Sequence, residues 1–178
     1  MAHRGEGAFV RRWFWRAVLA AVLIAFGAWL WSVVFPGPER VIRKRLAELA
    51  KSASFGGNES PLAALDNSQR VAGFFTEDIE VRMDLPGRSA QSLSGREQLF
   101  YVAKQTRSML AGLQVEFLDV NVAVGPDKQS AQVNLTLKGR VAGEKDLIVQ
   151  ELKLIMNKLE GKWKIKRVET VKTLSSYD

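Results

Sequence analysis

The chain has 178 residues, a formal net charge of +7, no cysteine and a single histidine, His3. Without cysteine there are no disulfides and no thiolate nucleophiles or metal ligands, and a histidine-dependent dyad is excluded everywhere after the N-terminal tail. The basic excess accompanies an apolar segment, and basic residues beside a membrane are attracted to anionic headgroups. We therefore expect no nucleic-acid partner.

The most informative stretch runs from Ala17 to Phe35, which contains no charge and one hydroxyl, that of Ser32. Its length is close to the roughly 20 residues that cross a bilayer as a helix. Tryptophans near both ends fit the two membrane interfaces, and no small-residue cleavage pattern follows. We expect an uncleaved, single-pass transmembrane anchor.

The orientation of this anchor is less constrained, because the basic flanks nearly balance. Four arginines lie in residues 1–16 and five basic residues lie in 40–51, so the positive-inside rule is not decisive. We favour an inner (cytoplasmic) membrane protein with its tail inside and its domain in the periplasm, since a first apolar segment commonly acts as a signal anchor. A domain facing the cytoplasm is the alternative.

The expected organisation is a basic tail at 1–16, the anchor at 17–35, a hinge at 36–38, one domain at 39–174 and a frayed tail at 175–178. The domain begins with apolar residues at helical spacing. Ser60 before Pro61 indicates an N-cap, and Ser94 with Glu97 indicates a capping box. The inward faces expected for the three helices are Ile42, Leu46, Leu49, Ala50 and Ala53, then Leu62, Leu65, Ala72 and Phe75, then Leu99, Val102, Ala103, Thr106 and Leu110.

The rest of the domain shows the two-residue alternation of strands. The apolar phase slips between Phe117 and Leu118, which indicates a β-bulge and a bent sheet, and residues 147–159 are apolar on both faces, as in a central strand. We predict an α+β fold in which three helices pack on one side of a strongly bent, mostly antiparallel sheet. The expected strands are 79–85, 89–93, 113–124, 131–141, 147–159 and 163–171, with turns at 86–87 and 160–162.

Three segments carry a resemblance to a known family: residues 74–87 (FFTEDIEVRMDLPG), 93–99 (LSGREQL) and 159–171 (LEGKWKIKRVETV). Over residues 39–174 the chain resembles the nuclear transport factor 2-like superfamily, whose cone-shaped fold is shared with ketosteroid isomerase and SnoaL-like polyketide cyclases. The resemblance implies a fold but little about function, because this fold hosts isomerases, cyclases, dehydratases and members without known chemistry.

The catalytic residues of these relatives do not map onto the domain. SnoaL-like cyclases use a histidine and an aspartate, and the domain has no histidine. Ketosteroid isomerases use an aspartate base with a tyrosine and a protonated aspartic acid, but the only tyrosines here are Tyr101 and Tyr177, and neither aligns with an aspartate dyad. We assign no catalytic residue, no cofactor and no metal ligand.

Polar residues interrupt two apolar rows, at Glu151 and Lys153 and again at Arg167 and Glu169. On adjacent antiparallel strands we expect Glu151 to pair with Arg167 and Lys153 with Glu169. The pairs form either an exposed ladder or the polar floor of a concave pocket. The residues proposed for ligand binding are Arg82, Tyr101, Glu151, Arg167 and Glu169.

The sequence thus favours a membrane-anchored domain that acts as a non-catalytic ligand-binding or protein-assembly module. Its expected partners are the membrane, a second copy bound through the sheet, and a small hydrophobic ligand or a membrane protein. The alternative is an isomerase, cyclase or hydratase acting on a small hydrophobic substrate. That alternative predicts a deep cone cavity that holds a buried carboxylate.

Overall fold

The computed structural model describes residues 21–26, 37–83 and 91–171, and the chain divides into two units, Met1–Gly37 and Pro38–Asp178. The described part of the first unit, 21–26, is helical. Within the described residues, no helix combines the length and the apolarity that crossing a membrane requires. Most of the predicted anchor at 17–35, together with the tails at 1–16 and 175–178 and the turn at 86–87, lies outside those residues.

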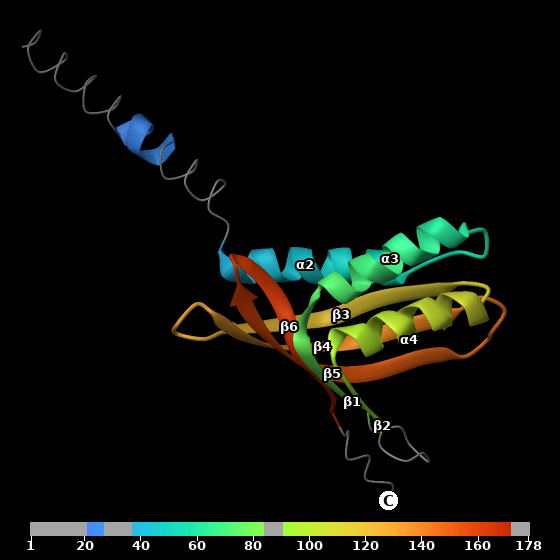
Figure 1. The fold of residues 1–178 in the computed structure, drawn as a ribbon. Coiled ribbons are helices and arrows are strands. Elements are labelled where there is room, and N and C mark those ends of the chain that lie inside the picture. Colours follow the sequence, from blue (N-terminus) through green and yellow to red (C-terminus); the bar gives the residue numbers. More distant parts are fainter. Residues whose placement is uncertain (1–20, 27–36, 84–90, 172–178) are drawn as a thin grey trace, which may run out of the picture. The chain divides into compact units, whose positions relative to one another are not determined.

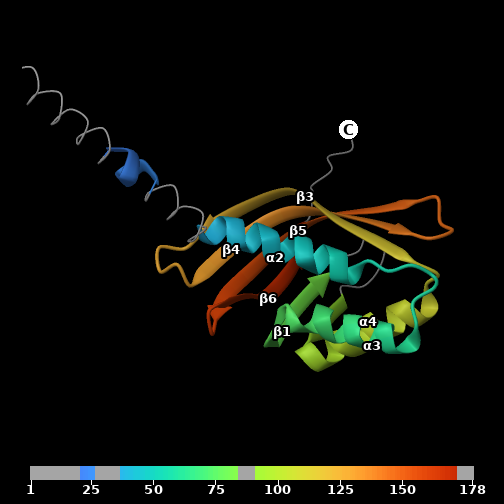
Figure 2. The ribbon, with the colours of Figure 1, turned by 90° about the horizontal axis from the view of Figure 1, so that it is seen from above.

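In its described residues, 38–83 and 91–171, the second unit contains three helices and a six-stranded sheet with the order β2-β1-β6-β5-β4-β3. Neighbouring strands are antiparallel except β1 and β6, which are parallel. The helices lie on one side of the strongly bent sheet (Figures 1 and 2), as the α+β prediction required. The elements are α2 (Pro38–Ala53), α3 (Pro61–Gly73), β1 (Phe75–Met83), β2 (Gln91–Ser94), α4 (Arg96–Met109), β3 (Leu113–Val124), β4 (Ser130–Val141), β5 (Leu147–Leu159) and β6 (Lys162–Thr170).

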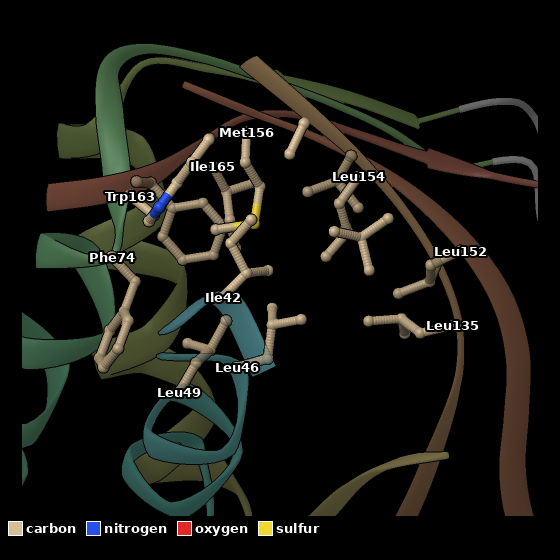
Figure 3. Close-up of a cluster of buried hydrophobic side chains, with 14 of the residues drawn as sticks. Ile42, Leu46, Leu49, Phe74, Leu135, Leu152, Leu154, Met156, Trp163 and Ile165 are labelled. Carbon is tan, nitrogen blue, oxygen red and sulfur yellow. The ribbon is translucent and has the colours of Figure 1, made fainter. Parts of the chain in front are cut away.

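Helix α2 covers the concave side of the sheet with the face that its periodicity predicted. Ile42, Leu46 and Leu49 are 0%, 1% and 5% exposed and point toward apolar side chains of β4, β5 and β6 (Figure 3). We call this side of the sheet the core face and the opposite side the outer face. Buried core-face residues on the strands are Ile79, Val81, Val133, Leu135, Leu152, Leu154, Met156, Trp163, Ile165 and Val168.

Helix α3 is turned differently from the prediction. Leu62 and Leu65 are 77% and 36% exposed, whereas the buried positions are Ser68, Val71 and Ala72. The Ser68 hydroxyl donates to a carbonyl one turn earlier at 2.7 Å, so this polar side chain is satisfied within its own helix and can be buried. The predicted inward face is therefore wrong at Leu62 and Leu65 and confirmed at Ala72 and Phe75, which are 6% and 7% exposed.

The two predicted helix caps have different outcomes. Ser60 caps α3, since its hydroxyl accepts a 3.3 Å hydrogen bond from the amide of Ala63. The capping box at Ser94 is wrong: α4 is preceded by Gly95, with φ of 89°, and has no side-chain cap. That backbone angle favours glycine, and it lets the Gly95 amide donate to the carbonyl of Ile79 at 2.8 Å, which ties α4 to β1.

The predicted bulge and the predicted final turn are both present. The register of β3 against β4 shifts between Leu118 and Asn121, and Asp119 has φ of 51°. Leu118 comes before the shift and is exposed, so the apolar residues that face the core after the bulge begin beyond it. Glu160 and Gly161 have φ of 50° and 78°, the paired positive values of a type I′ hairpin turn.

Strand β5 has the predicted bounds and lies centrally in the sheet. However, β6 pairs with it only from Leu152 onward, and its first three residues, Leu147, Ile148 and Val149, are 43%, 52% and 62% exposed. The expectation of cover on both faces therefore fails for this part of the strand, because Ile148 is exposed on the core face and Leu147 and Val149 on the outer face.

Candidate functional site on the outer face of the sheet

Charged side chains from β1 and β6 meet on the outer face. The parallel register places Glu80 beside Arg167 and Arg82 beside Glu169. Because alternate strand residues point to opposite faces, each of these side chains projects away from the core. Glu80 is the centre of the group: its Oε2 accepts from Arg167 Nε at 3.1 Å and lies 3.7 Å from Arg82 Nη2.

A third strand extends this group. Lys153 of β5 lies opposite Glu169 of β6, as predicted, and Glu169 Oε1 is 3.9 Å from Arg167 Nε. The side chains of Glu80, Arg82, Arg167 and Glu169 are 33% to 66% exposed, and exposed pairs contribute only about 0–1 kcal/mol each to stability. Their main effect is to place alternating charges on an otherwise open surface.

The other predicted pair is wrong. Because β5 and β6 are antiparallel, the pairing of Lys153 with Glu169 itself places Arg167 opposite Ile155, and Glu151 lies opposite Thr136 of β4. Glu151 is exposed and borders a hollow of about 280 Å³ that Asp119 and Val171 also line. It therefore belongs to the outer surface but not to the charged group.

Tyr101 is also separate from the charged group. It lies on α4, in the helical layer beyond the core face, where its side chain is 57% exposed and its ring meets Phe100 edge-on at 5.5 Å. Of the five predicted residues, the structure thus brings together Arg82, Arg167 and Glu169, and it places Tyr101 and Glu151 elsewhere.

Apolar side chains share the outer face with the charged group. By strand alternation, Leu147 and Val149 of β5 project from this face, and so does Leu118 of β3 just before its bulge. They are 43%, 62% and 42% exposed. The outer face therefore combines charges of both signs with exposed aliphatic residues, which is a composition found at protein interfaces.

The interior of the cone is filled. Ile42, Ile79, Val133 and Met156 are all 0% exposed, and Ile165 is 2% exposed. Across the described residues the buried polar or charged side chains are Ser68, Thr76 and Arg107, so none of the described carboxylates has the fully buried position that the enzyme hypothesis predicts. The same residues contain no group of three acidic or histidine side chains that could hold a metal ion.

Sequence reasoning missed a charged cluster inside the helical layer. Arg107 of α4 donates from Nη1 to both carboxylate oxygens of Glu59, at 2.9 and 2.7 Å, and from Nη2 to the carbonyl of Ser52. Asn67 donates to the same carboxylate at 2.6 Å. The side chains of Arg107 and Glu59 are 3% and 15% exposed, so this cluster joins the end of α2 to α3 and α4. Its position in the helical layer makes it structural.

The described architecture can be compared with known structures. A bent sheet with three helices on its concave side matches many solved proteins. One from Novosphingobium aromaticivorans, described as nuclear transport factor 2-like with a cystatin-like fold, has a TM-score of 0.57 and 17% identity over 89% of this chain and 90% of its own. The chain has the nuclear transport factor 2-like fold.

Two other solved structures with this fold show how broad its functions are. A provisionally named scytalone dehydratase from the same species has a TM-score of 0.55 and 17% identity over 78% of this chain and 87% of its own. A nuclear transport factor 2-like protein of unknown function from Pseudomonas putida has a TM-score of 0.56 and 13% identity over 78% and 88%. No family model and no curated protein matches the chain. The nuclear transport factor 2-like fold is thus shown by structure alone.

Proposed function

We propose that the chain is a membrane-held, non-catalytic assembly module whose nuclear transport factor 2-like domain forms a homodimer through the outer face of its sheet. The observation that carries the proposal is the exposure of Val149 and Leu147 at 62% and 43% on the same face as the group formed by Glu80, Arg82 and Arg167. A dimer removes these aliphatic side chains from water, at about 25 cal/mol for each Å² of apolar surface.

The charges on this face suit a second copy of the same chain. A twofold interface brings each surface patch against itself, so a patch with one sign of charge would repel its copy. Here Glu80 and Glu169 alternate with Arg82, Arg167 and Lys153 on adjacent strands. A rotated copy can therefore set acidic residues against basic ones, which fixes the orientation of the pair.

The proposed location rests on the sequence. The uncharged run at 17–35 has the length of a membrane span. We place the domain in the periplasm because the first apolar segment of a chain commonly acts as a signal anchor. Resistance of the chain to alkaline carbonate extraction of inner membranes tests the anchor. Activity of alkaline phosphatase fused after the domain tests the side, because that enzyme needs the oxidising periplasm; activity confined to a cytoplasmic reporter would reverse the orientation.

The dimer is tested on the full chain in detergent micelles by sedimentation equilibrium at micromolar concentration. We expect a dimer for the natural chain and a monomer for Val149→Asp, because the substitution places a charge in the proposed contact. Leu62→Asp is the matched control, since Leu62 is 77% exposed on α3, and it should remain a dimer. A monomeric natural chain, or equal behaviour of the two variants, would refute the proposed interface.

A second candidate is an enzyme of the isomerase, cyclase or hydratase type on a small hydrophobic substrate. It is favoured by the likeness to the provisionally named dehydratase and by the hollow beside Glu151 and Asp119. It ranks second because both carboxylates are exposed and the cone interior is filled. If it were correct, Glu151→Gln would abolish turnover of a lipophilic substrate.

A further inference from the structure

A groove runs between α2 and α3, on the opposite side of the domain from the proposed dimer face. Its volume is about 620 Å³, within the range of small-ligand sites. Three cationic side chains and one carboxylate border it. The lining residues include Arg45, Glu48, Lys51, Asn67, Arg70 and Phe74.

Arg45 is held in place from one side. Its guanidinium carbon lies 4.2 Å from the centre of the Phe74 ring, and Phe74 is itself 7% exposed, so one side of the guanidinium packs on a buried neighbour. Its only described ion pair is a long one, 3.6 Å from Nη1 to Glu48. The buried Nε has no hydrogen-bond partner among the described residues.

The other two cations, Arg70 and Lys51, also have N–H donors that are available to a ligand. Arg70 uses Nε on Asp66 at 3.0 Å, and a guanidinium has five N–H donors, so its outer nitrogens remain available. Lys51 is exposed and forms no ion pair with any residue in the described ranges. The groove thus has an uncompensated positive charge with arginine donors in it.

We propose that this groove binds a phosphate ester, held by Arg45, Lys51 and Arg70. A planar guanidinium matches two phosphate oxygens at once, and ordering of Arg45 on Phe74 before binding lowers the entropic cost of that contact. The amide of Asn67 adds a polar group at the same wall. The volume accommodates the phosphate together with the small alcohol that it esterifies.

Two sources present this chemistry: a soluble phosphate ester and the headgroup of an acidic phospholipid. The order of the chain supports the lipid source, because α2 begins at Pro38, directly after the predicted span and its hinge. The site does not depend on the dimer, since the two surfaces share no residue. Failure of either proposal therefore leaves the other intact.

The test uses the full chain, labelled with ¹⁵N, in phosphatidylcholine nanodiscs at ~50 mM ionic strength, where surface charges are weakly screened. Glycerol 3-phosphate is titrated in one arm. In the other, the nanodiscs contain about 30% phosphatidylglycerol and no soluble ester is added. Both arms follow the side-chain amide signal of Asn67. We expect this signal to move, and we expect the double variant Lys51→Gln/Arg70→Gln to weaken the interaction about thirtyfold, the size expected for two headgroup-facing charges.

The control is Lys104→Gln/Lys162→Gln, which removes the same charge at exposed positions outside the groove and should bind like the natural chain. A response to glycerol 3-phosphate alone supports the site and identifies the source as soluble. A response in phosphatidylglycerol nanodiscs supports the site and identifies the source as lipid. No response in either arm, or an equal loss in the control variant, overturns the proposal.

Discussion

Removal of the Arg107 guanidinium should destabilise the domain far more than removal of an exposed charge. Arg107→Met keeps most of the buried stem but leaves the Glu59 carboxylate, 15% exposed, with Asn67 as its remaining partner. It also leaves the Ser52 carbonyl without its donor and removes a cation–π contact in which the guanidinium carbon lies 4.7 Å from the centre of the Phe55 ring.

The size of the effect follows from these contacts. Breaking a buried ion pair by removing one partner costs about 3–5 kcal/mol, because the other charge stays buried without compensation. Glu59 keeps one hydrogen bond and some contact with water, so we expect a loss near ~3 kcal/mol in the free energy of unfolding. Neutralising both partners, in Arg107→Met/Glu59→Gln, should cost clearly less than the sum of the single changes.

Native-state hydrogen exchange of the full chain measures these values, because core amides such as those of Leu154 and Met156 exchange through global unfolding. The control cycle uses Arg70→Met and Asp66→Asn, an ion pair whose side chains are 67% and 59% exposed and whose coupling should be below about 1 kcal/mol. If the Arg107 and Glu59 cycle gave a coupling as small as this control, the structural role assigned to the buried pair would be wrong.

Three further results are expected. Ile42→Ala should lower the free energy of unfolding by about 2–5 kcal/mol because Ile42 is 0% exposed, whereas Leu62→Ala, at a 77% exposed position, should change it by less than about 0.5 kcal/mol; denaturant unfolding compares them. Gly57→Ala should destabilise the domain, because an added Cβ would lie 2.8 Å from the carbonyl oxygen of Ala111. A thermal unfolding midpoint that does not fall would contradict this. Backbone and hydroxyl donors from the turn hold the pKa of Asp127 below its ordinary 3.8. A carboxyl whose pKa is lower in the folded state stabilises that state at pH values above the pKa of the unfolded chain. The turn should therefore loosen only as the pH falls below about 4, which NMR titration of this carboxyl can check.

Much of the fold was predictable because periodicity reports burial directly. Ile42, Leu46 and Leu49 recur at helical spacing, and the phase slip near Leu118 marks the bulge of β3. The prediction failed where apolarity and burial separate. On α3, Leu62 is exposed while Ser68 is buried with its hydroxyl bonded within the helix, and a hydrophobic pattern does not detect a polar side chain that is satisfied in this way.

The charged sites were harder to predict, because they depend on register. Lys153 and Glu169 were paired correctly, but antiparallel strands run in opposite directions, so this pair requires Arg167 to lie opposite Ile155 rather than Glu151. A parallel partner strand, β1, then supplied Glu80 to Arg167. The sequence offers no local signal for a contact between residues 87 positions apart.

Arg107 did have a signal that could have been used. It lies four residues after Ala103 and three before Leu110, both of which were predicted to face inward, so a charge occupied the apolar face of α4. A charge at such a position is seldom buried without a partner, which predicts a carboxylate nearby. The identity of that partner, Glu59 in the loop before α3, still required the three-dimensional structure.

The two proposed surfaces lie on opposite sides of a filled core, and this arrangement limits how they can influence each other. Coupling between sites requires an element with two arrangements that both ligands bias. The core between α2 and the sheet contains side chains of 0% to 5% exposure, such as Leu46, Val133 and Leu154, and interiors packed in this way resist small displacements. Occupation of the groove by a phosphate ester should therefore leave the dimer dissociation constant unchanged, and by reciprocity dimerisation should leave the affinity for the ester unchanged. A measured coupling of tenfold or more between the two sites would refute this independence.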